Sequence, residues 1–185
     1  MRHGKRGFIR MKQYDVIIIG AGPGGIYSAW EMAMKKPELK IAVFEKGREL
    51  EKRKCPINGD TVKNCVGCPS CAIMSGFGGA GAFSDGKYVI STEYGGWLTE
   101  FLPDETVIDY IEQADAILVG FGATHERFQP SNELKKRCLE FDLHMSQAQL
   151  KHLGTDSNFE TMKRLVEALA KRVEIYPNTC VTAVD

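Results

Sequence analysis

The chain has 185 residues with 24 basic and 24 acidic side chains, so its formal net charge at pH 7 is zero. A length near 100–200 residues suits one domain with its own core, and 43% hydrophobic with 26% charged residues excludes a disordered chain. No apolar run approaches the roughly 20 residues of a membrane helix, and the zero charge argues against a nucleic-acid partner.

Residues 1–12 form a basic segment ahead of the first patterned stretch. They hold five basic side chains and no acidic one. The segment lacks the apolar core of a secretion signal, and Met11 stands just before the patterned part of the chain. We therefore predict a disordered basic arm, or a start site assigned too far upstream, and give residues 13–185 to the domain.

The next segments predict a strand, a helix and a second strand. Residues 14–19 are an apolar, β-branched run that is typical of a strand buried on both faces. Residues 24–35 repeat apolar side chains at helical spacing, and Pro37 follows. Residues 40–45 predict another buried strand. This order favours an α/β fold.

An irregular stretch, rich in Gly and Cys, occupies residues 48–100 and contains one short predicted strand at 88–90. Asp104 and Ser131 stand where helix caps are expected. The later elements that we predict are helices over 105–119, 132–141 and 159–170 and strands over 173–176 and 180–184.

The most specific motif lies between the first strand and the first helix. Its residues are Gly20, Ala21, Gly22, Pro23, Gly24 and Gly25. Gly20 permits a tight turn, Gly22 lets a pyrophosphate approach the backbone, and Gly25 lets the helix pack against the strand. The helix N-terminus offers unpaired N–H groups and a partial positive charge to phosphates. The motif predicts a dinucleotide site.

Glu45 ends the second predicted strand. A carboxylate at this place accepts the hydroxyls of an adenosine ribose and repels a 2′-phosphate, which favours FAD or NAD over NADP. The spacing of Gly25, Ala29 and Ala33, followed by residues 41–45, resembles the N-terminal dinucleotide fold of the glutathione-reductase-like flavoproteins. That resemblance favours FAD.

Four of the six cysteines lie close together in the irregular stretch. They are Cys55, Cys65, Cys68 and Cys71. A C-x2-C-x2-C run with a separate Cys-Pro is the ligand inventory of a [4Fe–4S] cluster, although the Cys-Pro comes first here. Zinc also accepts four thiolates, and a redox dithiol or unligated thiols are two further interpretations. Clustered cysteines without a secretion signal favour the cytoplasm.

A second glycine-rich segment follows the cysteines, with four glycines within residues 76–81. Such a loop exposes backbone N–H groups and lets a large planar ligand come close. Because a flavin ring needs hydrogen bonds along its edges, we predict that this loop meets a flavin. A bulged turn without a ligand is the alternative.

Taken together, the first glycine motif, the cysteine run and the string GFGGAGAFSDGK resemble FAD-dependent dehydrogenases common in anaerobic bacteria. The resemblance runs over nearly the whole chain from Met11. It implies an FAD-binding oxidoreductase with a Rossmann-like FAD/NAD(P)-binding fold, a small-molecule substrate, and NAD(P)H as electron donor in the full-length protein. It also implies that Gly79, Ala80 and Gly81 lie near the flavin, and that the backbone of Val181 meets the adenine.

Members of that family are much longer and return to the FAD fold near their C-terminus. We therefore expect an incomplete fold here: an N-terminal strand–helix–strand unit, a Cys/Gly-rich insertion and later helices and strands. A separately encoded C-terminal half would complete it, and Phe77, Phe83, Trp97 and Phe101 would be exposed without it. A metal or iron–sulfur electron-transfer module and an inactive fragment are the alternative functions.

No catalytic acid or base stands out in the sequence. His125, His144 and His152 are candidates by residue type, and Asp85 and Lys87 lie closest in sequence to the predicted flavin loop. A histidine in a loop is more often a surface residue. We therefore assign no catalytic residue.

Overall fold

The computed structural model describes residues 11–184. Most of the predicted basic arm, residues 1–10, lies outside the described residues. Lys12, at the end of that arm, contacts strand β5 (Glu174–Tyr176), because its Nζ lies 2.6 Å from both Glu174 Oε2 and Tyr176 Oη. Lys12 is therefore held against β5, and the interpretation of residues 1–12 as a disordered arm or an upstream start stays a prediction.

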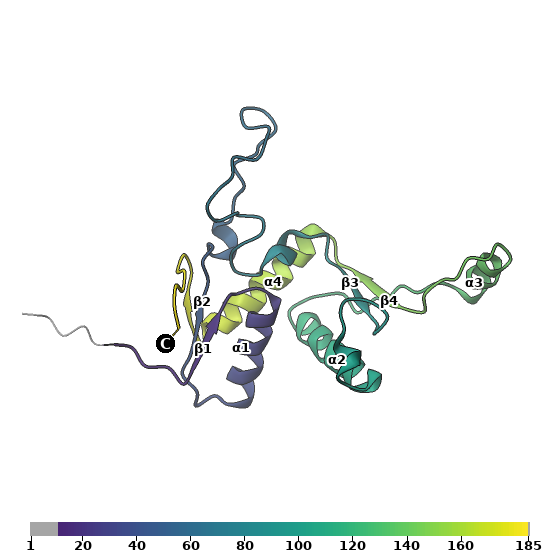
Figure 1. The fold of residues 1–185 in the computed structure, drawn as a ribbon, viewed down its shortest axis with the longest axis horizontal. Coiled ribbons are helices and arrows are strands. Elements are labelled where there is room, and N and C mark those ends of the chain that lie inside the picture. The colour runs from purple at the N-terminus through teal and green to yellow at the C-terminus, as the bar shows by residue number, and fades with distance from the viewer. Residues whose placement is uncertain (1–10, 185) are drawn as a thin grey trace, which may run out of the picture.

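The centre of the molecule is a three-stranded parallel sheet in the order β1-β2-β5. Strand β1 is Val16–Ile19 and strand β2 is Ile41–Phe44. Helix α1 (Pro23–Lys35) joins these two strands, and helix α4 (Thr155–Ala170) leads into β5; both helices lie against the sheet (Figure 1). The predicted strand–helix–strand unit is confirmed, and the fold is mixed α/β.

Small side chains bring α1 close to the sheet. Ala29 and Ala33 lie on the buried face of α1, and Leu165 and Leu169 of α4 complete the core beside them. Pro23 occupies the first turn of α1, where its fixed φ suits a helix and its missing N–H costs nothing. The core therefore lies between the sheet and this helix pair.

Strand β1 is exposed on the other face of the sheet within the described residues, whereas β2 is buried there at Ala42. Val16 and Ile18 pack on the core, whereas Ile17 and Ile19 are each 57% exposed. Successive side chains of a strand point to opposite faces. The prediction that this strand is buried on both faces is therefore wrong.

A second, antiparallel sheet is formed by β3 (Lys87–Ile90) and β4 (Gln149–His152). The sequence predicts β3 but not β4, because the mostly polar run of β4 lacks the apolar pattern of a strand. Helix α2 (Asp104–Gly120) packs against β3. This sheet and α2 form a lobe beside the central sheet (Figure 1).

One predicted helix cap and one predicted strand need correction. Asp104 does not cap α2: Pro103 is the N-cap, and Asp104 begins the helix. The predicted strand over 180–184 is absent among the described residues, because Asn178 adopts a positive φ of 53° and turns the chain beside the end of β2. Ser131 does cap α3 (Asn132–Leu139), where its Oγ accepts the N–H of Leu134 at 3.1 Å.

Two segments project from the body in Figure 1: a loop of residues 54–71, called here the Cys-bearing arm, and the segment that carries α3. Trp97 and Phe101 are exposed as predicted. Phe77 is instead wholly buried, and Phe83 is half-buried, so their predicted exposure is wrong. Among the described helices, none is long and apolar enough to cross a membrane.

Candidate cofactor-binding site

The first glycine-rich segment forms the tight turn between β1 and α1. Gly20 has a φ of 97°, and its N–H donates to the carbonyl of Phe44 at 2.8 Å. A Cβ on Gly25 would lie 1.9 Å from the carbonyl oxygen of Gly20. These two glycines therefore have the turn and packing roles that the sequence predicts.

The N-terminus of α1 faces open space. Gly22 is its N-cap and supplies no side-chain hydrogen bond, and the first turn contains no acidic residue. A Cβ on Gly22 or Gly24 would meet no protein atom within 4 Å. Because the first N–H groups of a helix have no intrahelical acceptor and carry a partial positive charge, this end of α1 suits an anion.

Glu45 is buried at the end of β2, where its carboxylate accepts three backbone hydrogen bonds. Oε2 accepts the N–H of Ala21 at 2.8 Å, and Oε1 accepts those of Gly47 at 2.8 Å and Gly76 at 3.0 Å. The carboxylate thus ties both glycine-rich segments to β2, a role that the sequence analysis missed. A carboxylate has about four lone-pair sites, so these three hydrogen bonds leave one acceptor position. The predicted contact of Glu45 with a ribose stays a prediction.

The two glycine-rich segments lie directly against each other. The N–H of Gly78 donates to the carbonyl of Ala21 at 2.9 Å. Gly79 has a φ of 61°, and a Cβ there would lie 3.1 Å from both Gly22 Cα and Pro23 Cδ. Ala80 and Gly81 follow in a short 3₁₀ helix, Ala80–Phe83. The structure therefore brings the two predicted parts of the site together.

Arg53 lies behind the second glycine-rich segment and is only 3% exposed. Its guanidinium donates to the carbonyls of Ala72 at 2.9 Å and Ile73 at 2.7 Å, and to those of Phe77 at 2.7 Å and Gly79 at 2.8 Å. Burial lowers the pKa of Arg53 from its ordinary value. No sequence pattern singles out this residue, which stands among exposed charged neighbours.

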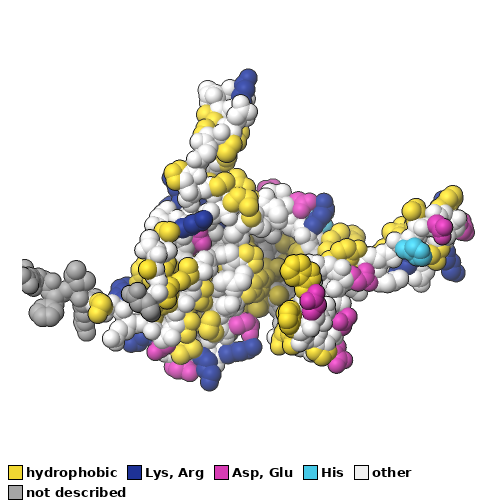
Figure 2. All heavy atoms as spheres, viewed as in Figure 1, with side chains coloured by type: hydrophobic (Ala, Val, Ile, Leu, Met, Phe, Trp, Pro, Cys, Tyr) yellow, Lys and Arg dark blue, Asp and Glu magenta, His cyan; other side chains and the backbone are white. Residues whose placement is uncertain are grey.

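A cavity of about 340 Å³, called here the central pocket, opens beside these segments. Pro23 of α1, Gly78 and Gly81 line one side, and Tyr88 of β3 and Leu118 of α2 line the other. Figure 2 shows hydrophobic side chains around a hollow between α2 and the rest of the body. Its volume lies within the range of about 300–1,000 Å³ that is usual for small-molecule sites.

A buried ion pair supports the polar wall of the central pocket. Lys151 Nζ of β4 lies 2.7 Å from both carboxylate oxygens of Asp115 on α2, and both residues are buried. Tyr88 Oη donates to Asp115 Oδ1 at 3.2 Å. Burial, followed by the charge of Asp115, raises the pKa of Tyr88. Both Asp115 and Tyr88 line the pocket, and the sequence analysis predicted neither.

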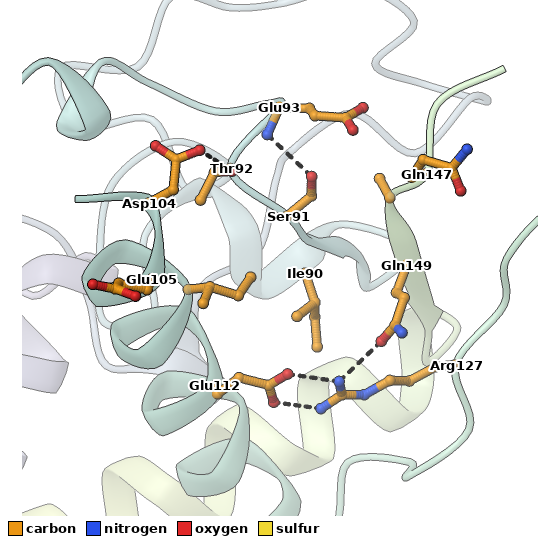
Figure 3. Close-up of a pocket in the computed structure, with 12 residues that line it drawn as sticks. Ile90, Ser91, Thr92, Glu93, Asp104, Glu105, Glu112, Arg127, Gln147 and Gln149 are labelled. Atoms are coloured by element: carbon orange, nitrogen blue, oxygen red, sulfur yellow. Dashed lines mark hydrogen bonds and ion pairs between the residues drawn. The ribbon is translucent and has the colours of Figure 1, made fainter. Parts of the chain in front are cut away.

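The same network reaches a second cavity of about 400 Å³, whose lining is acidic (Figure 3). Arg127 donates to Glu112 at 2.7 Å and to Gln149 at 3.0 Å there, and its Nη2 lies 3.1 Å from Asp115. Asp104 accepts from Thr92 at its edge. Arg127 therefore links α2 to the β3–β4 sheet.

The four clustered cysteines are not gathered into a ligand set. Cys65 and Cys68 are exposed, whereas Cys55 and Cys71 are half-buried. Within residues 11–184, no three His, Cys, Asp or Glu side chains lie close enough together to hold a metal ion. The predicted cluster or zinc site is thus not confirmed, because the thiols are spread along a projecting arm. The dithiol and unligated interpretations stay open.

Local hydrogen bonds shape both ends of the Cys-bearing arm. Asn58 Oδ1 accepts the N–H groups of three residues that follow it closely, and so closes a turn in the arm. Backbone N–H groups of Met74 and Ile73, and then the charge of Arg53, lower the pKa of Cys71. Of the thiols in the arm, that of Cys71 therefore lies nearest to the guanidinium of Arg53.

The segment after β5 runs beside the end of β2. The N–H of Asn178 donates to the carbonyl of Gly47 at 2.7 Å, and that of Thr179 donates to the carbonyl of Glu45 at 2.8 Å. Val181 follows in irregular backbone and is half-buried. Its predicted contact with an adenine stays a prediction.

The histidines that the sequence offered as candidates are not part of the central pocket. None of His125, His144 and His152 lines it, whereas Lys87 does. Lys87 forms an exposed ion pair with Asp85 at 2.7 Å. The polar side chains that line this pocket are those of Tyr27, Ser84, Lys87, Tyr88, Asp115 and Asn158.

Comparisons with known proteins give limited matches. A model described as the Thi4 family matches residues 2–50, a span that includes β1, α1 and β2. The L-amino acid deaminase from Proteus myxofaciens, solved in complex with anthranilate, is 14% identical with a TM-score of 0.37, over 95% of this chain. The L-amino acid deaminase from Proteus vulgaris is 15% identical with a TM-score of 0.41, over 91% of this chain. The chain spans 40% of the length of each. The search of curated proteins found no match.

Proposed function

We propose that this chain binds FAD and forms the N-terminal part of an FAD-dependent oxidoreductase, with β1, α1, β2 and β5 as a Rossmann-like unit. The observation that carries the proposal is the contact between the two glycine-rich segments at the uncapped N-terminus of α1. Gly22 leaves open space there, and Gly79 touches it from the other segment. The central pocket begins at the same place, because Pro23 and Gly81 line it.

The residues around this point fit the parts of FAD. The first-turn N–H groups of α1 suit the pyrophosphate. Glu45 has one acceptor position left for the adenosine ribose, and the segment that leads to Val181, which we propose for the adenine, runs beside the end of β2. Gly79 touches Gly22 at the phosphate end, and Gly81 lines the central pocket, where we place the flavin ring.

When bound, FAD supplies hydride transfer to or from a substrate. The chain itself supplies a largely apolar pocket beside the ring. Tyr88 stays protonated at neutral pH, since the ordinary pKa of a tyrosine is about 10 and burial raises it further here, and its hydroxyl donates to Asp115 Oδ1. Its oxygen can therefore accept, but not donate, a hydrogen bond from a ligand. The substrate is a small molecule, and NAD(P)H is the electron donor that we propose for the full-length protein.

The proposed enzyme also contains a further segment, on a longer chain or on a separate one. The exposure of Ile17 and Ile19 on one face of β1 supports this, because the described residues leave more than half of each residue exposed. Apolar faces of this kind mark contact with another segment or chain. We propose a cytoplasmic location for the assembled enzyme.

A visible absorption spectrum of the protein, purified without oxygen and then mixed with FAD and desalted, tests the proposal. We expect the two flavin bands, in the blue and the near ultraviolet, to stay with the protein. A broad brown shoulder in place of these bands would favour an iron–sulfur module on the Cys-bearing arm. A colourless protein after desalting would favour an inactive fragment.

A further inference from the structure

Arg53 is a buried cation that is held by carbonyls instead of a carboxylate. No carboxylate of residues 11–184 lies within ion-pair distance of it. The aromatic ring of Phe83 lies over the guanidinium, with 4.6 Å from Cζ to the ring centroid. Burying a charge is costly unless it is well hydrogen-bonded, and Arg53 meets this requirement through the backbone of one loop.

The four carbonyls belong to two neighbouring stretches of chain. Ala72 and Ile73 directly follow the Cys-bearing arm, and Phe77 and Gly79 belong to the second glycine-rich segment. Three different nitrogens of the guanidinium make these bonds. A planar fork of five N–H donors can hold four separate carbonyls, whereas a lysine ammonium has three donors at one point.

The second glycine-rich segment needs these hydrogen bonds because its own backbone does not favour a single conformation. Gly76, Gly78 and Gly79 have φ values of 120°, 86° and 61°, and glycine loses more conformational entropy on ordering than other residues. A Cβ on Gly76 would lie 2.6 Å from Arg53 Cδ, so the loop is closely fitted to this side chain. A loop that is ordered before the ligand arrives binds it more tightly.

We propose that Arg53 is a positioning residue for the cofactor: its guanidinium presets the glycine-rich segment at residues 76–81 against the N-terminus of α1. This inference rests on the proposed function. It assigns Arg53 no contact with FAD, since the side chain reaches the site through the carbonyls of Phe77 and Gly79. It also makes residues 72–73, directly after the Cys-bearing arm, and the second glycine-rich segment parts of one hydrogen-bonded unit.

Titration with FAD, followed by flavin fluorescence, tests the inference on the full chain. We expect Arg53→Ala to weaken FAD binding by about tenfold or more, because the loop must then be ordered at the expense of binding. Arg53→Lys should remain weak although it keeps the charge. Millimolar guanidinium should restore binding to Arg53→Ala, and ammonium should not. Lys52→Ala, which changes an exposed neighbouring cation, should bind as the parent does.

Hydrogen exchange at the amides of Gly78 and Gly79 gives a second measurement that needs no cofactor. We expect these amides to exchange faster in Arg53→Lys than in Lys52→Ala. This comparison tests the inference even if Arg53→Ala does not fold. Unchanged exchange, or parental FAD affinity in folded Arg53 variants, would overturn the inference. If the parent itself binds no FAD, the proposed function fails and the cofactor role of Arg53 fails with it, whereas exchange alone still reports whether Arg53 orders the loop.

Discussion

Replacing Glu45 with alanine is expected to lower the free energy of unfolding by about 3 kcal/mol or more. The N–H groups of Ala21, Gly47 and Gly76 lose their acceptor, and a buried polar group left without a partner costs about 1–3 kcal/mol. Urea unfolding followed by circular dichroism measures the change. Glu49→Ala is the matched control, because Glu49 forms an exposed ion pair with Lys52, and such pairs contribute about 1 kcal/mol at most.

The same pair of variants separates the two roles of Glu45. If Glu45→Ala is as stable as Glu49→Ala, the carboxylate does not tie the glycine-rich segments together. Lost FAD affinity without lost stability would make Glu45 solely a ribose ligand, as the sequence predicts. Glu45→Arg should weaken both properties, because the acceptor is lost from the turn and from the site of the ribose.

The buried pair of Asp115 and Lys151 gives the second large effect. We expect Asp115→Ala to destabilise the protein by about 3–5 kcal/mol, because an uncompensated lysine is left buried. Asp109→Ala, at an exposed position of the same helix, should change little. Thermal or urea unfolding of the two variants measures the difference.

A double variant shows whether the charge or the packing matters at this place. Replacing a buried ion pair with apolar residues of similar size is often neutral. Asp115→Leu combined with Lys151→Met should therefore recover most of the stability that Asp115→Ala loses. A double variant as unstable as Asp115→Ala would show that Arg127 and Tyr88, the other partners of Asp115, depend on its carboxylate.

The parts of the fold that follow from local patterns could be predicted from the sequence. The strand–helix–strand unit has its apolar periods, its glycine turn and Pro23 within one short stretch. Strand β4 has no such pattern, since it is mostly polar and depends on pairing with β3, which lies far from it in the sequence. The turn at Asn178 likewise depends on a hydrogen bond to the carbonyl of Gly47, and no local sequence pattern predicts it.

The candidate site also has parts that could be predicted from the sequence and parts that could not. Each glycine-rich segment is recognisable alone, but the contact between Gly22 and Gly79 exists only in the folded chain. Arg53 stands in a run of charged residues that is typical of a solvated surface, and it is buried because the loop at residues 72–79 closes over it. Asp115 is the polar member of an otherwise apolar helix face, so pattern alone gave it no role.

Binding of FAD to Gly22→Val, compared with Gly24→Ala, tests the central claim most directly. Both side chains would project into open space, so both variants should fold, and alanine suits a helix better than glycine. We predict that Gly22→Val weakens FAD binding at least tenfold, or about 1.4 kcal/mol, because valine would occupy the space of the pyrophosphate, whereas Gly24→Ala binds nearly as the parent does. Equal FAD affinity of the two variants would contradict the placement of the cofactor at the N-terminus of α1.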